Sequence, residues 1–81
     1  MALTLLFLGP LEDAAGTGEM VLEVAGALSL GAIAERLPPE LAVAISGPKV
    51  RTALNGAIVA PGEIAAGDGD ELAFLPPVSG G

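Results

Sequence analysis

Residues 71–81 read ELAFLPPVSGG, and the rest of the fold is arranged around this stretch. Its first five residues are mostly apolar and have the length of a strand. Proline has a fixed φ and no N–H to donate to a neighbouring strand, so Pro76 and Pro77 end this strand. We therefore predict a folded domain over residues 1–75 and a separate, flexible tail over residues 76–81.

The tail finishes in two glycines, Gly80 and Gly81. Glycine has no Cβ, so a partner protein can close tightly around the backbone. Six extended residues reach roughly 20 Å at about 3.3–3.6 Å each, which is long enough to enter a neighbouring active site. We predict that Gly81 is the reactive group and that the residues before it seat the tail in the partner: Pro76, Pro77, Val78, Ser79 and Gly80. A frayed, inert end is the alternative.

The composition disfavours several kinds of partner. The chain has 81 residues, enough for one domain with a modest core. Ten acidic and three basic residues give a net charge of -7, which disfavours nucleic acid and membranes and favours a partner with a basic surface. Alternatively, the acidity only keeps an Ala- and Leu-rich chain in solution.

Cysteine and histidine are both absent, so this chain offers no disulfide, no thiolate or imidazole metal ligand and no Cys or His catalytic group. We predict no bound metal or cofactor and no catalytic side chains. The apolar run at residues 2–8 lacks a basic segment before it and is too short to span a bilayer, so we interpret it as a strand. Without disulfides or a secretory signal, a cytoplasmic location is predicted.

Periodicity and turn residues predict the remaining elements. The run at residues 1–8 is almost continuously apolar, which is typical of a strand covered on both faces. Ser29 is a plausible N-cap, and Asn55-Gly56 is a strong hairpin signal. We predict strands over residues 1–8, 19–24, 50–54, 57–60 and 71–75, and helices over residues 11–15, 30–37 and 40–45. This order indicates an α+β fold, a mixed sheet with helices packed on one face.

The helix-free face of that sheet is where we expect a partner to dock. Phe7, Ile58 and Leu75 are the candidates for an apolar patch there, and core packing is the alternative for each. The acidic run at residues 68–71 lacks the spaced ligands of a calcium-binding loop, so we interpret it as a turn before the last strand.

Two segments resemble a known family. The end of the chain, with Ala53-Leu54-Asn55-Gly56, then Gly67-Asp68-Gly69-Asp70-Glu71 and the final PPVSGG, resembles the small subunit of molybdopterin synthase, a ubiquitin-like sulfur carrier. Residues 6–16 are similar to that family's first strand and helix. Gly9-Pro10 departs from the family, which more often has Ala and a varied polar residue there.

The resemblance implies a β-grasp, ubiquitin-like fold and a role for the tail. It implies that an E1-like adenylyltransferase uses ATP to adenylate Gly81, which then becomes a thiocarboxylate. The small subunit would dock on the large catalytic subunit in a heterotetramer and donate sulfur to cyclic pyranopterin monophosphate, in molybdenum cofactor biosynthesis.

Other functions stay open. The same carrier chemistry could serve thiamine, cysteine or tRNA thiolation. The chain could also be a ubiquitin-like modifier whose Gly81 is joined to lysines of other proteins. A plain binding module with an inert tail is a further alternative.

Overall fold

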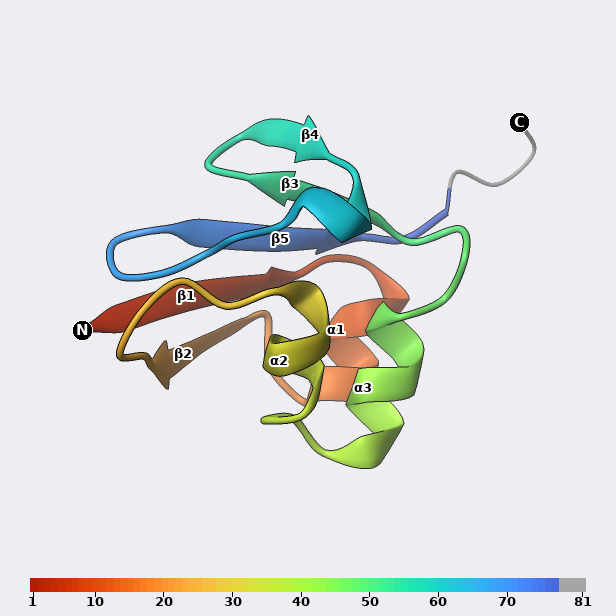
Figure 1. Cartoon of the computed structure of the whole chain (residues 1–81). Helices are drawn as coiled ribbons and strands as arrows, with labels where there is room; N and C mark the ends of the chain where they lie inside the picture. The colour runs from red at the N-terminus through yellow and green to blue at the C-terminus, as the bar shows by residue number, and fades with distance from the viewer. Residues whose placement is uncertain (78–81) are drawn as a thin grey trace.

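The computed structural model describes residues 1–77 of the chain. Figure 1 shows a single sheet with three α-helices gathered on one side of it. The chain order is β1 (Ala2–Phe7), α1 (Pro10–Ala15), β2 (Glu19–Glu23), α2 (Leu30–Ala34), α3 (Pro39–Ile45), β3 (Arg51–Leu54), β4 (Ala57–Val59), a 3-10 turn (Pro61–Glu63) and β5 (Glu71–Leu75). The α+β prediction is confirmed, and β5 ends at Leu75 as expected from the two prolines that follow.

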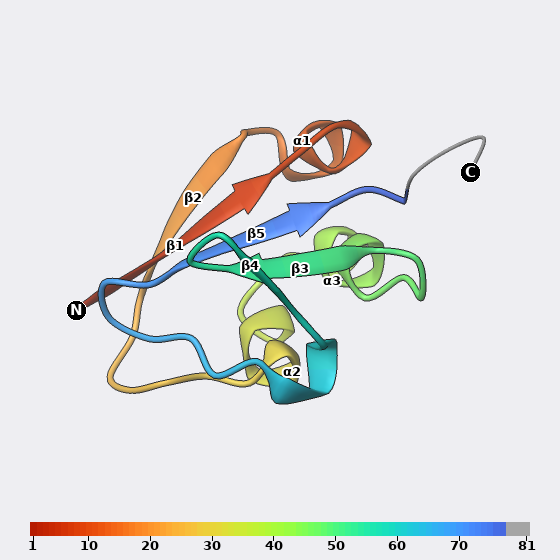
Figure 2. The same cartoon turned by 90° about the horizontal axis from the view of Figure 1, so that it is seen from above.

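The sheet has five strands in the order β2-β1-β5-β3-β4. β1 and β5 pair in parallel, with Thr4 opposite Glu71 and Phe7 opposite Phe74, and the other neighbours are antiparallel. The first and last strands therefore lie side by side in the middle. Figure 2 shows both pointing toward the end of the sheet where α1 begins and where the described chain ends.

The core lies between the sheet and the helices. Leu3, Leu5 and Phe7 of β1 are buried, together with Leu72 and Phe74 of β5. The Phe7 and Phe74 rings stack with their centroids 5.6 Å apart. Fully burying a large apolar side chain contributes about 1.5–3 kcal/mol before the entropy cost of folding, and these five residues form the sheet's share of a larger core cluster.

Burial along β1 alternates, which corrects one expectation. Ala2, Thr4 and Leu6 point to the other face and are partly exposed, whereas their neighbours are buried. The apolar run therefore does not mark a strand covered on both faces. The helices cover only one face of the sheet. Leu6 is an apolar residue on the other, uncovered face.

The cap of α2 was predicted correctly but its end was not. The Ser29 hydroxyl accepts a hydrogen bond from the Ala32 amide at 3.2 Å, as expected of an N-cap. The helix ends at Ala34 rather than at residue 37. The amides of Arg36 and Leu37 bond to carbonyls three residues back, so the last turn is tighter than an α-helix.

The hairpin at Asn55-Gly56 is confirmed, with φ values of 51° and 87°. The Asn55 side chain also reaches β5, where it accepts from the Glu71 amide at 2.9 Å and donates to Asp70 Oδ1 at 3.0 Å. Asp70 Oδ2 accepts from the Gly67 amide at 2.8 Å. We refer to Asn55, Asp70 and Glu71 as the hairpin clamp. The Asp70 amide donates to the Gly67 carbonyl at 3.0 Å, so the acidic run forms a turn that leads into β5 at Glu71, as expected.

The clamp also perturbs the titration of Asp70. The hydrogen bonds from Asn55 and from the Gly67 amide lower the pKa of the Asp70 carboxyl below its ordinary value, because both donors favour its charged form.

Within residues 1–77, no helix combines the length and the apolar character needed to cross a membrane.

Candidate functional site: the tail base and the open sheet face

The parallel pairing of β1 and β5 determines where the tail starts. The Leu8 amide donates to the Phe74 carbonyl at 3.1 Å, which holds the two strands together to their ends. Beyond this bond β1 turns into α1 at Gly9, and β5 continues into Pro76 and Pro77. The start of a helix and the base of the tail therefore lie against each other.

Gly9 lies against the first residue of the tail. Its backbone has φ 58° and ψ -136°, a conformation open to glycine and strongly unfavourable for other residues. A Cβ built on Gly9 would stand 3.0 Å from Cγ of Pro76, which is closer than carbon atoms normally approach. The absence of a side chain at Gly9 thus makes room for the proline that starts the tail.

The face of the sheet away from the helices carries a band of apolar side chains, which we call the open-face stripe. The strand register puts Leu6, Ala73, Ala53 and Ile58 in one row across four strands, and Leu75 lies beside the row on β5. Ile58 is 62% exposed and the other four are partly exposed. Apolar residues that neighbour one another on an uncovered face are typical of an interaction surface.

Two of the three predicted docking residues, Ile58 and Leu75, belong to this stripe. The expectation for Phe7 was wrong: it is 2% exposed and stacks on Phe74 within the core. Successive strand side chains point to opposite faces, so Leu6 takes the outward position that was assigned to Phe7. Strict alternation counted from Leu3 and Leu5 would have found Leu6, which the sequence reasoning missed.

Val78, Ser79, Gly80 and Gly81 lie outside the described residues. Their roles in tail insertion and in reaction therefore stay predictions. Pro76 is half-buried and Pro77 is exposed, as suits the point at which a tail leaves a domain.

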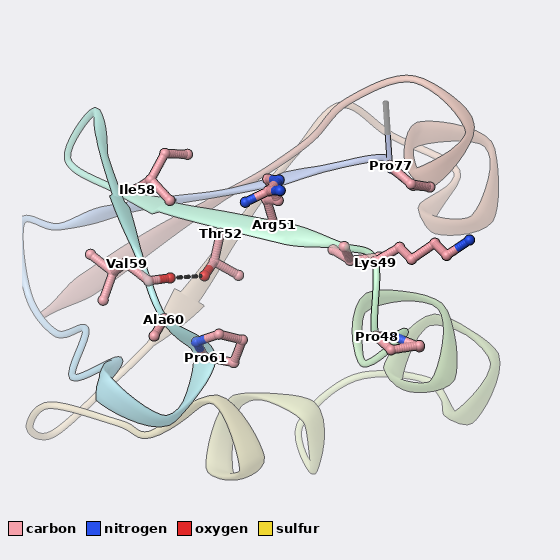
Figure 3. Close-up of a pocket in the computed structure, with 10 residues that line it drawn as sticks. Pro48, Lys49, Arg51, Thr52, Ile58, Val59, Ala60, Pro61 and Pro77 are labelled. Atoms are coloured by element: carbon pink, nitrogen blue, oxygen red, sulfur yellow. Dashed lines mark hydrogen bonds between the residues drawn. The ribbon is translucent and has the colours of Figure 1, made fainter. Parts of the chain in front are cut away.

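A groove of about 610 Å³ opens beside the tail base (Figure 3). One wall is the segment that enters β3, the other is β4 with the turn after it, and Pro77 lies at the end nearest the tail. The Thr52 hydroxyl donates to the Val59 carbonyl at 2.6 Å and ties the two walls together. The lining residues are Pro48, Lys49, Val50, Arg51, Thr52, Ile58, Val59, Ala60, Pro61 and Pro77.

The part of the chain that the structure describes contains no group of three or more acidic side chains placed to hold a metal ion.

Comparison with known proteins agrees with this geometry. SAMP1 from Haloferax volcanii is 30% identical with a TM-score of 0.77, and the match covers 100% of both chains. SAMP1 from Methanosarcina acetivorans is 25% identical over 99% of this chain and 96% of that chain, with a TM-score of 0.73. One chain of the solved complex of subunits 1 and 2 of the molybdopterin-converting factor from Helicobacter pylori matches at 22% identity with a TM-score of 0.66, and the match covers 100% of both chains.

These likenesses confirm the predicted β-grasp, ubiquitin-like fold. No curated protein matches the chain. Residues 5–81 match the ThiS family, which is nearly the whole chain and includes its two final glycines. The chain therefore belongs to the ThiS family of ubiquitin-like proteins.

Proposed function

We propose that this chain is the sulfur carrier subunit of molybdopterin synthase. The observation that carries the proposal is the family match through Gly81, combined with a PPVSGG ending that starts where β5 stops. The domain holds the base of the tail in place at Pro76, and the final glycines are slender enough for a narrow channel in a partner.

The chemistry needs an activated carboxylate. In the first step the Gly81 carboxylate attacks the α-phosphorus of ATP, forming an acyl adenylate and releasing pyrophosphate. A hydrosulfide equivalent then replaces AMP at the carbonyl, which gives a thiocarboxylate and one proton. The thiocarboxylate sulfur is the nucleophile toward cyclic pyranopterin monophosphate. Every acid, base and metal can come from the partners, in keeping with a carrier that has neither Cys nor His.

Two partners follow from this chemistry: an E1-like adenylyltransferase that uses the ATP, and the large catalytic subunit that accepts the tail. The open-face stripe beside the tail base is the surface we assign to docking. The Helicobacter pylori structure is a complex of subunits 1 and 2, but at 22% identity it supports only the shared fold. The large subunit is therefore proposed from the PPVSGG ending. We place the reaction in the cytoplasm, in keeping with a chain without cysteine.

A protein modifier is the second candidate. It is favoured by the 30% identity to Haloferax volcanii SAMP1 over the full length of both chains, since a structure of that protein is described as a small archaeal modifier protein. In this case the activated Gly81 carbonyl would form an amide with a lysine amine of another protein.

One experiment tests the chemistry that all carrier functions share. The protein is incubated with ATP, sulfide and the E1-like enzyme of the same organism, and its intact mass is measured. Replacement of one oxygen by sulfur, mapped to Gly81, is the expected result. No change in mass, with an E1-like enzyme that is active on a known carrier, would contradict the proposal.

A second experiment separates the candidates. The thiocarboxylated protein is supplied to the large subunit with cyclic pyranopterin monophosphate, and molybdopterin is measured. Formation of the dithiolene product supports the molybdopterin pathway. Adducts in cell extracts that survive thiol treatment, without product in the reconstituted reaction, would favour the modifier.

A further inference from the structure

We propose that the groove beside the tail base receives an acidic, extended segment of the enzyme that activates the tail. This inference rests on the proposed function in one respect: it requires an activating enzyme, which a sulfur carrier and a protein modifier both need. It gives Lys49 and Arg51 a role in binding, and neither the fold nor the chemistry of the tail explains these two residues.

The argument begins with the distribution of charge. The chain carries ten acidic and three basic residues, and two of the three basic residues, Lys49 and Arg51, line this one groove. Among residues 1–77, the ion pair that forms joins the Met1 amino group to Glu23 at 3.3 Å, and neither Lys49 nor Arg51 has a carboxylate partner. Two of the three basic side chains therefore lie near each other on a strongly acidic protein, and no ion pair within residues 1–77 accounts for their position.

The shape of the groove suits an extended chain. β4 pairs with β3 from Thr52 to Leu54, so Arg51, the first residue of β3, has no partner strand on this side, and Lys49 lies in the segment that leads into it. An open strand edge can accept a further extended segment through backbone hydrogen bonds. Ile58 and Val59 supply an apolar wall next to the two cations.

The position of the groove selects the partner. Pro77, the last described residue, lines it, and Figure 3 shows Arg51 projecting from β3 between Ile58 and Pro77. A protein that contacts the chain at Pro77 therefore lies next to the groove. Ile58 belongs to both the groove and the open-face stripe, so the two surfaces are continuous.

The groove then determines the orientation in which the partner docks. This chain has a net charge of -7, so we expect its partner to present mainly basic groups. Attraction between the two net charges alone does not select one orientation. One acidic segment on that partner, placed against Lys49 and Arg51, would be repelled from the rest of this surface. Opposite charge patterns of this kind suppress wrong orientations as well as adding affinity.

Charge reversal tests the inference with a matched control. Lys49→Glu, Arg51→Glu and Arg36→Glu each lower the net charge by the same amount, but Arg36 does not line the groove. We expect Lys49→Glu and Arg51→Glu each to weaken binding to the purified E1-like enzyme about tenfold or more, as for close charge pairs at interfaces. Arg36→Glu should leave the affinity unchanged or raise it. Equal effects of all three variants would overturn the inference.

Covalent capture provides an independent test, because Lys49 is the only lysine of the chain. A zero-length carbodiimide reagent should join its amine to an Asp or Glu of the E1-like enzyme, found by peptide mass spectrometry. Lys49→Arg should abolish this cross-link while keeping the affinity. A cross-link of Lys49 only to this chain's own carboxylates would contradict the proposal.

A small anion is the competing occupant of the groove. Binding of AMP by this chain alone, lost in Lys49→Glu, would make the groove a small-anion site and overturn the proposed occupant. If the wild-type chain neither binds the E1-like enzyme nor gains sulfur, the proposed function itself fails. Binding and sulfur gain that the two groove variants leave unaltered would sink only the groove inference.

Discussion

Replacing Gly9 by alanine is the sharpest test of the tail base. Gly9 belongs neither to the tail nor to the open-face stripe, yet its missing side chain makes room for Pro76. If that contact aligns the tail, Gly9→Ala should impair thiocarboxylation at Gly81 more than its effect on stability explains.

The magnitude follows from two terms. The backbone at φ 58° and ψ -136° costs a non-glycine residue about 1–3 kcal/mol of folding free energy. The new Cβ would stand 3.0 Å from Pro76 Cγ, so the proline must move by about half an ångström to reach an ordinary carbon contact of about 3.5 Å. Since a misplacement of about 1 Å can cost about 100-fold in rate, we expect a loss on the order of tenfold.

Gly16→Ala is the matched control. Gly16 also has a positive φ, at 76°, but a Cβ there meets nothing within 4 Å. It should lose about 1–2 kcal/mol of stability from the backbone alone, without an effect on the tail. Urea unfolding gives the stability of each variant, and single-turnover formation of the thiocarboxylate, well below the melting temperature, gives the rate.

A double mutant isolates the contact. Pro76→Ala removes the Cγ atom that the new methyl group at position 9 would strike, so Gly9→Ala should cost less in that background, with a coupling of about 0.5 kcal/mol or more. Equal rate losses in Gly9→Ala and Gly16→Ala, or a coupling near zero, would refute the idea that Gly9 positions the tail.

Three other perturbations have defined outcomes. Ile58→Asp should change the unfolding free energy by no more than about 0.5 kcal/mol, because the side chain is 62% exposed. The same variant should weaken binding to the E1-like enzyme about tenfold. Unchanged binding would show that Ile58 is not part of the docking surface. Asn55→Ala should reduce the pH dependence of the unfolding free energy, because it removes the hydrogen bond that contributes most to lowering the pKa of Asp70. In the wild type, the lowered pKa adds stability above the ordinary Asp pKa of 3.8. This stability is lost as the pH falls through the lower pKa of the folded state. Urea unfolding between about pH 5 and pH 2 measures this, and parallel curves for variant and wild type would contradict it. One residue appended after Gly81 should abolish thiocarboxylation while the melting temperature stays the same, and a normal mass gain would exclude the free terminus as the reactive group.

Residues with restricted or unusual backbone preferences made most of the fold predictable. Asn55-Gly56 located the hairpin, Ser29 the start of α2, and the two prolines after Leu75 the end of β5. Each acts locally, through its own φ or its own hydrogen bond, so the signal does not depend on the rest of the chain.

The faces of β1 were harder to predict because they depend on pairing. Leu3, Leu5 and Phe7 differ little in polarity from Leu6, yet the first three face the helices and Leu6 belongs to the open-face stripe. In a strand this apolar the alternation is weak, and Thr4, between Leu3 and Leu5, is the one polar residue that indicates which face is uncovered. The misplacement of Phe7 has this origin.

Two features of the site required three-dimensional information. The contact of Gly9 with Pro76 joins residues far apart in sequence, and nothing in either segment indicates the other. The groove combines residues on both sides of the β3–β4 hairpin with Pro77, so the proximity of Lys49 and Arg51 to the tail could not be read from spacing.

The central pairing of β1 with β5 has a consequence for biosynthesis. A ribosome makes β1 first and β5 last, and β3 with β4 can join the sheet only through β5. Such long-range pairing slows folding and delays it until the last strand is available. A nascent chain shorter than about 75 residues leaves Leu3, Leu5 and Phe7 without their partners on β5. Folding is therefore tied to completion of synthesis at least through Leu75, and a product that ends before β5 would stay unfolded and exposed to proteolysis.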